Sequence, residues 1–66
     1  MSTKELFEKE HIDSDFIERK FDGSYWESCA KFINENWNRE IESMSAKQAA
    51  WLTRILYDCV EKRIEG

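Results

Sequence analysis

The chain has 66 residues, of which 41% are hydrophobic and 36% are charged, and fourteen acids against ten bases give a formal net charge of −4. This length allows one small domain, the 14% of aromatic residues exclude a disordered polar tail, and the acidic balance disfavours nucleic-acid binding. Two glycines and no proline argue against a turn-rich all-β domain. We therefore expect a single helical domain over residues 1–66.

Residues 1–23 form an acidic arm, in which we expect one or two short helices. The stretch Ser2–Glu5 can cap a short helix that carries Leu6 and Phe7. Asp13 can cap a second helix, with Gly23 as the residue that follows its end.

A β-hairpin over residues 12–29 is the alternative for this region. Asp22-Gly23 is a favoured two-residue hairpin turn. Phe16 and Ile17 are adjacent, however, and break the alternation of a half-buried strand, so the helix is favoured over the hairpin.

The next segment has a strong helical pattern. Ser24 and Glu27 again fit a capping box. Beyond them, apolar residues recur every three or four positions: Trp26, Ala30, Ile33, Trp37, Ile41 and Met44. This spacing predicts an amphipathic helix over residues 25–43.

A second long helix is predicted over residues 46–64. Ser45 and Gln48 provide its capping box. Its apolar residues share one broad face and include Leu52, Ile55, Leu56, Cys59 and Val60. The predicted fold is therefore all-α: two long amphipathic helices over 24–66, packed as a hairpin or at an angle, with the N-terminal helices folded over them.

Three aromatic residues are interface candidates. Tyr25 and Phe32 lie on a second flank of the first long helix, and Trp51 lies at the edge of the apolar face of the second helix. One facing helix cannot cover both sides of the first helix. Either the N-terminal arm folds over this flank, or the flank binds a partner or a second copy of the chain.

The sequence offers no catalytic, cofactor-binding or metal-binding motif. His11 is the single histidine and has no nucleophile at a recognisable spacing. Cys29 and Cys59 lack the paired spacing of a zinc site, and no glycine-rich phosphate loop is present. We expect a protein without enzymatic activity whose thiols are buried and reduced, with a disulfide between them as the alternative.

The charge of the chain is unevenly distributed. Residues 1–28 hold eight acids and four bases, whereas residues 29–66 hold six of each, so the whole excess lies in the first part. The acids predicted to bind a partner are Glu5, Glu8, Glu10, Asp13, Asp15 and Glu18. We expect this arm to bind a larger protein with a basic surface, which makes the chain a regulator or inhibitor.

Two resemblances accompany this interpretation. In size, acidity and helix content, the chain is similar to the small inhibitors that phages encode against host defence or nucleic-acid enzymes, including anti-CRISPR proteins. The stretch Ser45–Leu52 resembles helices in short phage replication-associated proteins. The first resemblance covers the whole chain without a motif and implies an inhibitor of a larger protein.

Two other functions are alternatives. One is a structural or assembly module that forms a homodimer through the aromatic helical face. The other is a helical nucleic-acid-binding domain that uses Arg19, Lys20, Lys31, Arg39, Lys47 and Arg54. These bases alternate with acids and form no basic stripe, so nucleic acid is the less favoured partner.

The sequence also indicates where the protein resides. The charged start of the chain lacks the apolar segment of a secretory signal, and no stretch approaches the roughly 20 apolar residues that span a bilayer. We expect a cytoplasmic protein without a membrane partner.

Overall fold

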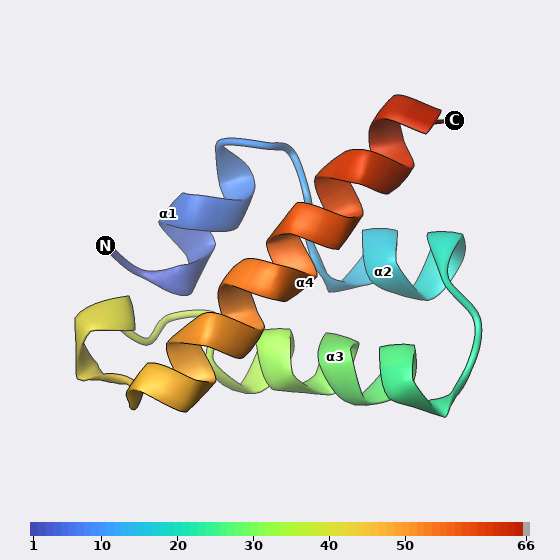
Figure 1. Ribbon diagram of the computed structural model, residues 1–66. Coiled ribbons are helices and arrows are strands. Elements are labelled where there is room, and N and C mark those ends of the chain that lie inside the picture. Colours follow the sequence, from blue (N-terminus) through green and yellow to red (C-terminus); the bar gives the residue numbers. More distant parts are fainter. Residues whose placement is uncertain (66) are drawn as a thin grey trace.

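The computed structural model describes residues 1–65, which form an all-α fold (Figure 1). The helices are α1 (Thr3–Glu8), α2 (Ser14–Lys20), α3 (Ser24–Glu35) and α4 (Ala46–Glu65), with a short 3₁₀ helix η1 (Ile41–Ser43) before α4. Helices α2 and α3 lie side by side, and α4 crosses them at an angle. The predicted all-α class is confirmed.

Three of the predicted helix starts are confirmed, because their caps are local. At α1, Ser2 and Glu5 exchange hydrogen bonds of 3.2 Å between side chain and amide in both directions. At α4, Ser45 and Gln48 do the same, again at 3.2 Å. At α2, the Asp13 carboxylate accepts a hydrogen bond of 3.0 Å from the backbone amide of Phe16. Each cap satisfies amides that the first helical turn leaves unpaired.

The start of α3 differs from the prediction. Gly23, not Ser24, is the N-cap residue, and no side chain caps the helix, so the predicted Ser24–Glu27 capping box is wrong. Gly23 was also predicted to follow the end of α2, but that helix ends in an extended cap at Phe21. Gly23 has φ +114° and ψ 158°, a conformation that only glycine adopts readily, and it turns the chain from α2 into α3.

The end of α3 also differs, since the helix stops at Glu35 and not at residue 43. Asn36 is the C-cap residue: its backbone amide donates to the Phe32 carbonyl at 3.1 Å, and its side-chain amide donates to the same carbonyl at 2.9 Å. Residues beyond this point form turns and η1.

Contacts with α1 hold the segment after α3 out of the helical conformation. The Trp37 carbonyl accepts from the Lys4 amide at 2.9 Å. The Arg39 carbonyl accepts from the Thr3 amide at 3.1 Å. Two amides of the first turn of α1 thereby gain partners that no residue of α1 can offer. The tertiary pairing outweighs the local helical pattern of this segment.

The core lies on two sides of α3. On the α2 side, Phe21 stacks on Trp26 with ring centroids 3.9 Å apart. On the α4 side, Phe32 stacks on Trp51 with centroids 4.2 Å apart. The buried apolar residues are Phe7, Ile12, Phe16, Ile17, Cys29, Ala30, Phe32, Ile33, Leu52, Ile55 and Cys59. Both apolar flanks of α3 are therefore covered within the chain.

Candidate functional site

Half of the predicted partner-binding acids hold the fold together. Glu5 belongs to the capping box of α1, and Asp13 caps α2. Glu10 forms an ion pair of 2.8 Å with Arg63, which ties the loop after α1 to the C-terminal part of α4. These three carboxylates have partners within the chain, so they are less suited to bind another protein.

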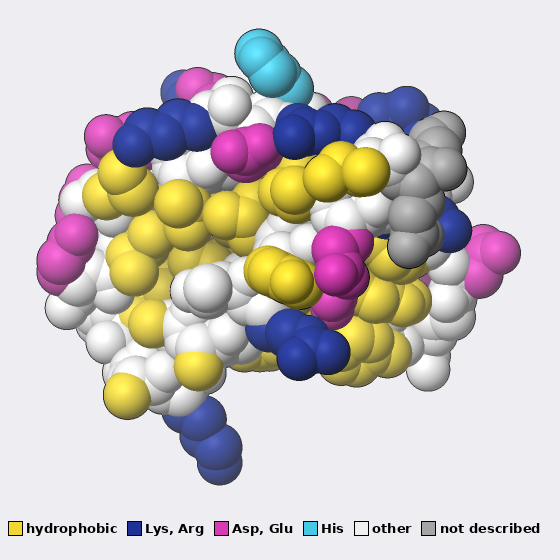
Figure 2. Space-filling model, turned by 45° about the horizontal axis from the view of Figure 1, so that its top comes forward, with side chains coloured by type: hydrophobic (Ala, Val, Ile, Leu, Met, Phe, Trp, Pro, Cys, Tyr) yellow, Lys and Arg dark blue, Asp and Glu magenta, His cyan; other side chains and the backbone are white. Residues whose placement is uncertain are grey.

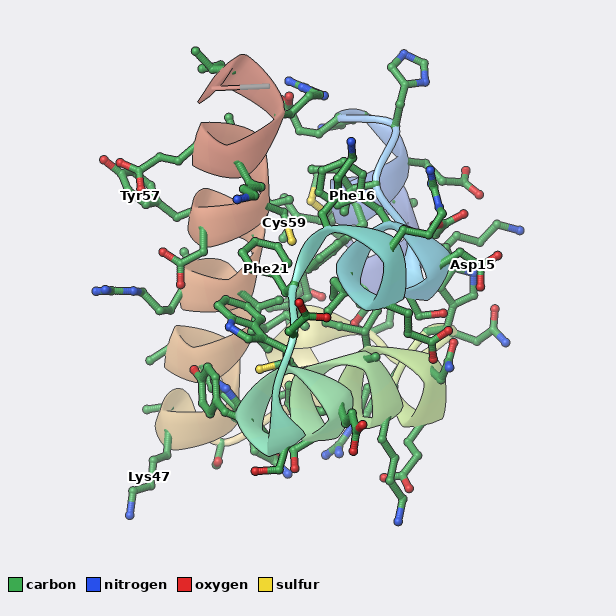
Figure 3. The ribbon with its side chains drawn as sticks, turned by 90° about the vertical axis from the view of Figure 1, so that its right-hand side faces the viewer. Asp15, Phe16, Phe21, Lys47, Tyr57 and Cys59 are labelled. Carbon is green, nitrogen blue, oxygen red and sulfur yellow. The ribbon has the colours of Figure 1, made fainter. Side chains whose placement is uncertain are left out.

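The other three acids of the predicted partner-binding set are exposed: Glu8, Asp15 and Glu18. Glu8 lies in α1, whereas Asp15 and Glu18 lie in α2. Figure 3 shows Asp15 on the side of α2 away from α4, while Phe16 and Phe21 project into the molecule. The arm is thus divided between structural carboxylates and free ones.

One of the free acids lines a pocket at the turn from α2 to α3, which we call the acidic pocket. Its volume is about 350 Å³. Its lining residues are Glu18, Phe21, Asp22, Gly23, Trp26 and Glu27. The three carboxylates are exposed, and the Phe21–Trp26 pair provides the aromatic surface between them. Tyr25 extends this surface, with its ring edge-on to Trp26 at 5.1 Å.

Sequence reasoning did not select two of these acids, Asp22 and Glu27. Asp22 lies near the end of the acidic arm and Glu27 lies beyond it, and they come together with Glu18 only because the chain reverses at Gly23. The Asp-Gly pair was the available signal for this reversal. A reversal between two helices brings acids from the end of one beside acids from the start of the other.

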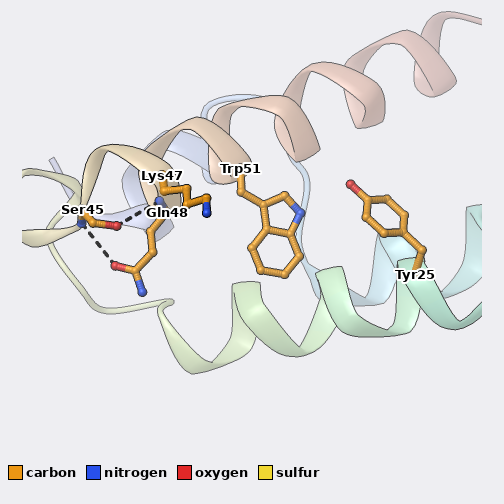
Figure 4. A pocket seen from close by; sticks show the side chains of 5 residues that line it. All are labelled: Tyr25, Ser45, Lys47, Gln48 and Trp51. Atoms are coloured by element: carbon orange, nitrogen blue, oxygen red, sulfur yellow. Dashed lines mark hydrogen bonds between the residues drawn. The ribbon is translucent and has the colours of Figure 1, made fainter.

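The aromatic interface candidates do not form one surface. Phe32 is buried against Trp51, and the Tyr25 side chain is 52% exposed. Tyr25 and Trp51 line a wide hollow of about 730 Å³ between α3 and the first turns of α4, with Ser45, Lys47 and Gln48 (Figure 4). The Phe32 side chain belongs to the core, so this flank offers a partner mainly Tyr25.

Two bases of the alternative nucleic-acid surface, Arg39 and Arg54, form contacts with neighbouring residues of the chain. Arg39 donates to the hydroxyl and the carbonyl of Ser43, at 3.0 and 2.9 Å. Arg54 pairs with Asp58 at 3.4 Å, one helical turn further along α4. These side chains are thereby oriented along the protein surface by their own neighbours.

The two cysteines are free and buried. Burial raises the pKa of the Cys59 thiol to about 12. Burial also raises the pKa of the Cys29 thiol. Since the thiolate is the nucleophilic and metal-binding form, both thiols are poor candidates for chemistry in the folded protein.

His11 has a structural position in the loop after α1. It has φ +57°, and its amide donates to the Glu8 carbonyl at 3.0 Å. The next amide, of Ile12, donates to the Phe7 carbonyl at 3.1 Å. This pair of bonds is the Schellman motif, and the buried Ile12 and Phe7 side chains supply its hydrophobic contact.

Within residues 1–65, no group of three His, Cys, Asp or Glu side chains lies close enough together to hold a metal ion. None of the helices in this range has the length and apolarity that crossing a membrane requires. No protein-family model matches the chain, and no curated protein and no solved structure is significantly similar to it.

Proposed function

We propose that this protein is a small non-enzymatic interaction module that regulates or inhibits a larger protein by docking on a basic surface of that protein. One observation carries the proposal: three carboxylates, of Glu18, Asp22 and Glu27, line the acidic pocket together with the stacked rings of Phe21 and Trp26. The pocket combines the two features that bind a cationic side chain, negative charge and an aromatic surface.

An arginine of the partner suits this pocket better than a lysine. A guanidinium group is planar, stacks on aromatic rings and donates to carboxylates in a bidentate manner, whereas an ammonium group acts as a point charge. Each exposed carboxylate contributes only modestly by itself. The specificity therefore comes from the combination of Glu18, Asp22 and Glu27 with the rings of Phe21 and Trp26.

The distribution of charge supports fast association with a basic partner. The net charge of the chain is −4, and the eight acids and four bases of residues 1–28 account for all of it. The acidic pocket lies in this part of the chain. A local excess of negative charge accelerates encounter with a basic surface and makes the association rate fall as salt is added.

Binding of a short arginine-rich peptide tests the docking chemistry. We expect the triple variant Glu18→Gln, Asp22→Asn, Glu27→Gln to bind the peptide about tenfold more weakly, because it removes the carboxylates of the pocket and keeps their shape. A peptide with citrulline in place of arginine is the neutral counterpart and should bind neither protein. Titration by NMR identifies the site through the indole resonance of Trp26.

A matched control separates the pocket from the overall charge. The variant Glu8→Gln, Asp15→Asn, Glu35→Gln removes the same number of charges from exposed positions outside the pocket. We expect it to bind within about threefold of the natural chain, with a salt effect of the same sign. Equal losses in both triple variants would contradict the proposal that the pocket is the docking site.

The same two variants test the biological proposal as baits for proteins of the native cell. A genuine partner is retained by the natural chain and by the control variant, and is lost from the pocket variant. Salt-dependent binding of DNA or RNA to the natural chain, with no protein retained, would instead favour the nucleic-acid alternative and overturn the proposal.

A further inference from the structure

The outer face of α4 carries an uncharged seam that the described residues leave largely uncovered. The seam residues are Ala46, Ala50, Thr53, Tyr57, Val60 and Ile64. Five of these residues are exposed and lie away from the buried face of the helix, which contains Leu52, Ile55 and Cys59. Val60 lies at the edge of the seam and is half-buried against the core. Tyr57 is 63% exposed and Ile64 is 78% exposed. Figure 3 shows Tyr57 on the side of α4 away from the rest of the molecule, and Figure 2 shows a face of the molecule on which hydrophobic side chains are interspersed with charged ones.

The seam has the spacing of a coiled coil. Its six positions follow one another at intervals of 4, 3, 4, 3 and 4 residues. This is the alternating spacing of the a and d positions of a heptad, which predicts packing against another helix. The core-facing side of α4 packs inside the molecule, so α4 is apolar on two opposite faces.

We propose that the occupant of this seam is a second copy of the chain, bound antiparallel through α4. The sizes of the seam residues favour this orientation. The N-terminal half of the seam has small residues, whereas the C-terminal half has large ones. Antiparallel packing centred on residue 55 places each small residue opposite a large one: Ala46 with Ile64, Ala50 with Val60, and Thr53 with Tyr57 of the second copy.

The surface already shows the hollow that this packing fills. A shallow, wide-open groove of about 810 Å³ lies along the small half of the seam. Its lining includes Ala46, Ala50 and Thr53 of the seam, with Tyr57 at one end. The large side chains of the second copy would enter this groove, and its own groove would accept those of the first. The interface is thus self-complementary, as a twofold symmetric dimer requires.

The flanking charges agree with the antiparallel orientation. In this register, Lys47 lies beside Glu61 of the second copy, and the pair occurs twice by symmetry. Arg54 lies close to its own equivalent near the twofold axis, but each Arg54 is paired with Asp58 of its own helix. A parallel dimer would instead bring Glu61 beside Leu56 and would form no pair of opposite charges across the interface.

Sedimentation velocity over a concentration series tests the proposal. We expect the natural chain to shift from monomer toward dimer in the micromolar range, and Tyr57→Glu to weaken the dimer at least about tenfold while leaving the helical CD signal unchanged. Tyr57 is exposed in the monomer, so its substitution leaves the core intact. A natural chain that stays monomeric at every concentration would overturn the proposal. So would a dimer that Tyr57→Glu does not weaken.

A charge exchange tests the orientation. Lys47→Glu should weaken the dimer, since it places two carboxylates together, and addition of Glu61→Lys should restore it to within about threefold. Within one chain these residues are about 21 Å apart along the helix, so they cannot compensate each other there. A double variant that stays as weak as Lys47→Glu would contradict the antiparallel register.

The arginine-peptide assay with Tyr57→Glu separates this inference from the proposed function, because that substitution lies outside the acidic pocket and leaves peptide binding unchanged.

Discussion

Thr3 is a polar residue whose side chain lies in the interior of the protein. Its side chain is fully buried at the start of α1. Its hydroxyl oxygen has no hydrogen-bond partner among the residues that the structure describes. A buried hydroxyl without a partner loses its hydration and gains nothing in exchange. The backbone amide of Thr3, in contrast, is satisfied by the Arg39 carbonyl.

We expect Thr3→Val to raise the free energy of unfolding by about 1 kcal/mol, because valine keeps the shape of threonine and removes the unpaired hydroxyl. Urea denaturation followed by circular dichroism measures the change. Thr3→Ser is the control: it keeps the hydroxyl, removes the buried methyl group and should be destabilising by a similar amount. A clear loss of stability in Thr3→Val would show that the hydroxyl is hydrogen-bonded after all.

At the scale of elements, the turn between α2 and α3 depends on Gly23. A Cβ atom added there would meet nothing within 4 Å, so space does not require glycine. The backbone conformation does, since its φ of +114° is one that other L-residues rarely adopt. This turn also brings Glu18 beside Asp22 and Glu27, so the acidic pocket depends on the same residue.

Substitution Gly23→Ala should lower the free energy of unfolding by about 1–3 kcal/mol through backbone strain alone. Chemical synthesis of a chain with D-alanine at position 23 provides the matched control, because a D-residue adopts positive φ without this strain. We expect the D-alanine chain to be at least as stable as the natural one. If both alanine chains lost the same stability, the cause would be steric and not conformational.

At the scale of the whole molecule, contacts of Met1 attach the N-terminal residue to the segment before α4. The α-amino group of Met1 donates to Glu42 at 2.8 Å and also pairs with Glu40 at 2.9 Å. The Met1 carbonyl accepts from the Ile41 amide at 2.8 Å. Hydrogen bonds to Glu42 and then Glu40 raise the pKa of this amino group from 8.0 to about 10. The same pairing lowers the pKa of the Glu42 carboxyl.

This contact predicts a loss of stability at alkaline pH. The amino group is protonated more strongly in the folded chain than in the unfolded one, so its contribution is fully present below pH 8.0 and is lost as the pH passes about 10. We expect the melting temperature of the natural chain to exceed that of an N-terminally acetylated chain at neutral pH. The difference should vanish above the raised pKa, and a difference independent of pH would contradict this assignment. The comparison cancels the titration of lysines and tyrosines, which both chains share.

The sequence by itself determined the features that depend on neighbouring residues. The all-α class, the caps at Ser2, Asp13 and Ser45 and the two-sided character of α3 follow from spacing, and the structure confirms them. Caps are predictable because donor and acceptor lie three residues apart, whatever the rest of the chain does.

The candidate sites could be predicted only in part. The sequence selected the acidic arm, but it could not show that Glu5, Glu10 and Asp13 have partners within the chain. Glu10 pairs with Arg63 across more than fifty residues, a contact without any local signal. In α4, the spacing indicates the inward face through Leu52, Ile55 and Cys59, whereas only the fold shows that the opposite face stays largely uncovered.

Only the tertiary structure decided where α3 ends and which surfaces remain exposed. The apolar spacing continues through Trp37 and Ile41, yet the helix stops at Glu35, because carbonyls of the following segment bind amides of α1. A helical pattern reports the local preference of a segment, whereas its final conformation also depends on hydrogen-bond partners that the fold brings from elsewhere. The excess negative charge was fixed by the sequence, and the reversal at Gly23 gathered part of it into one pocket.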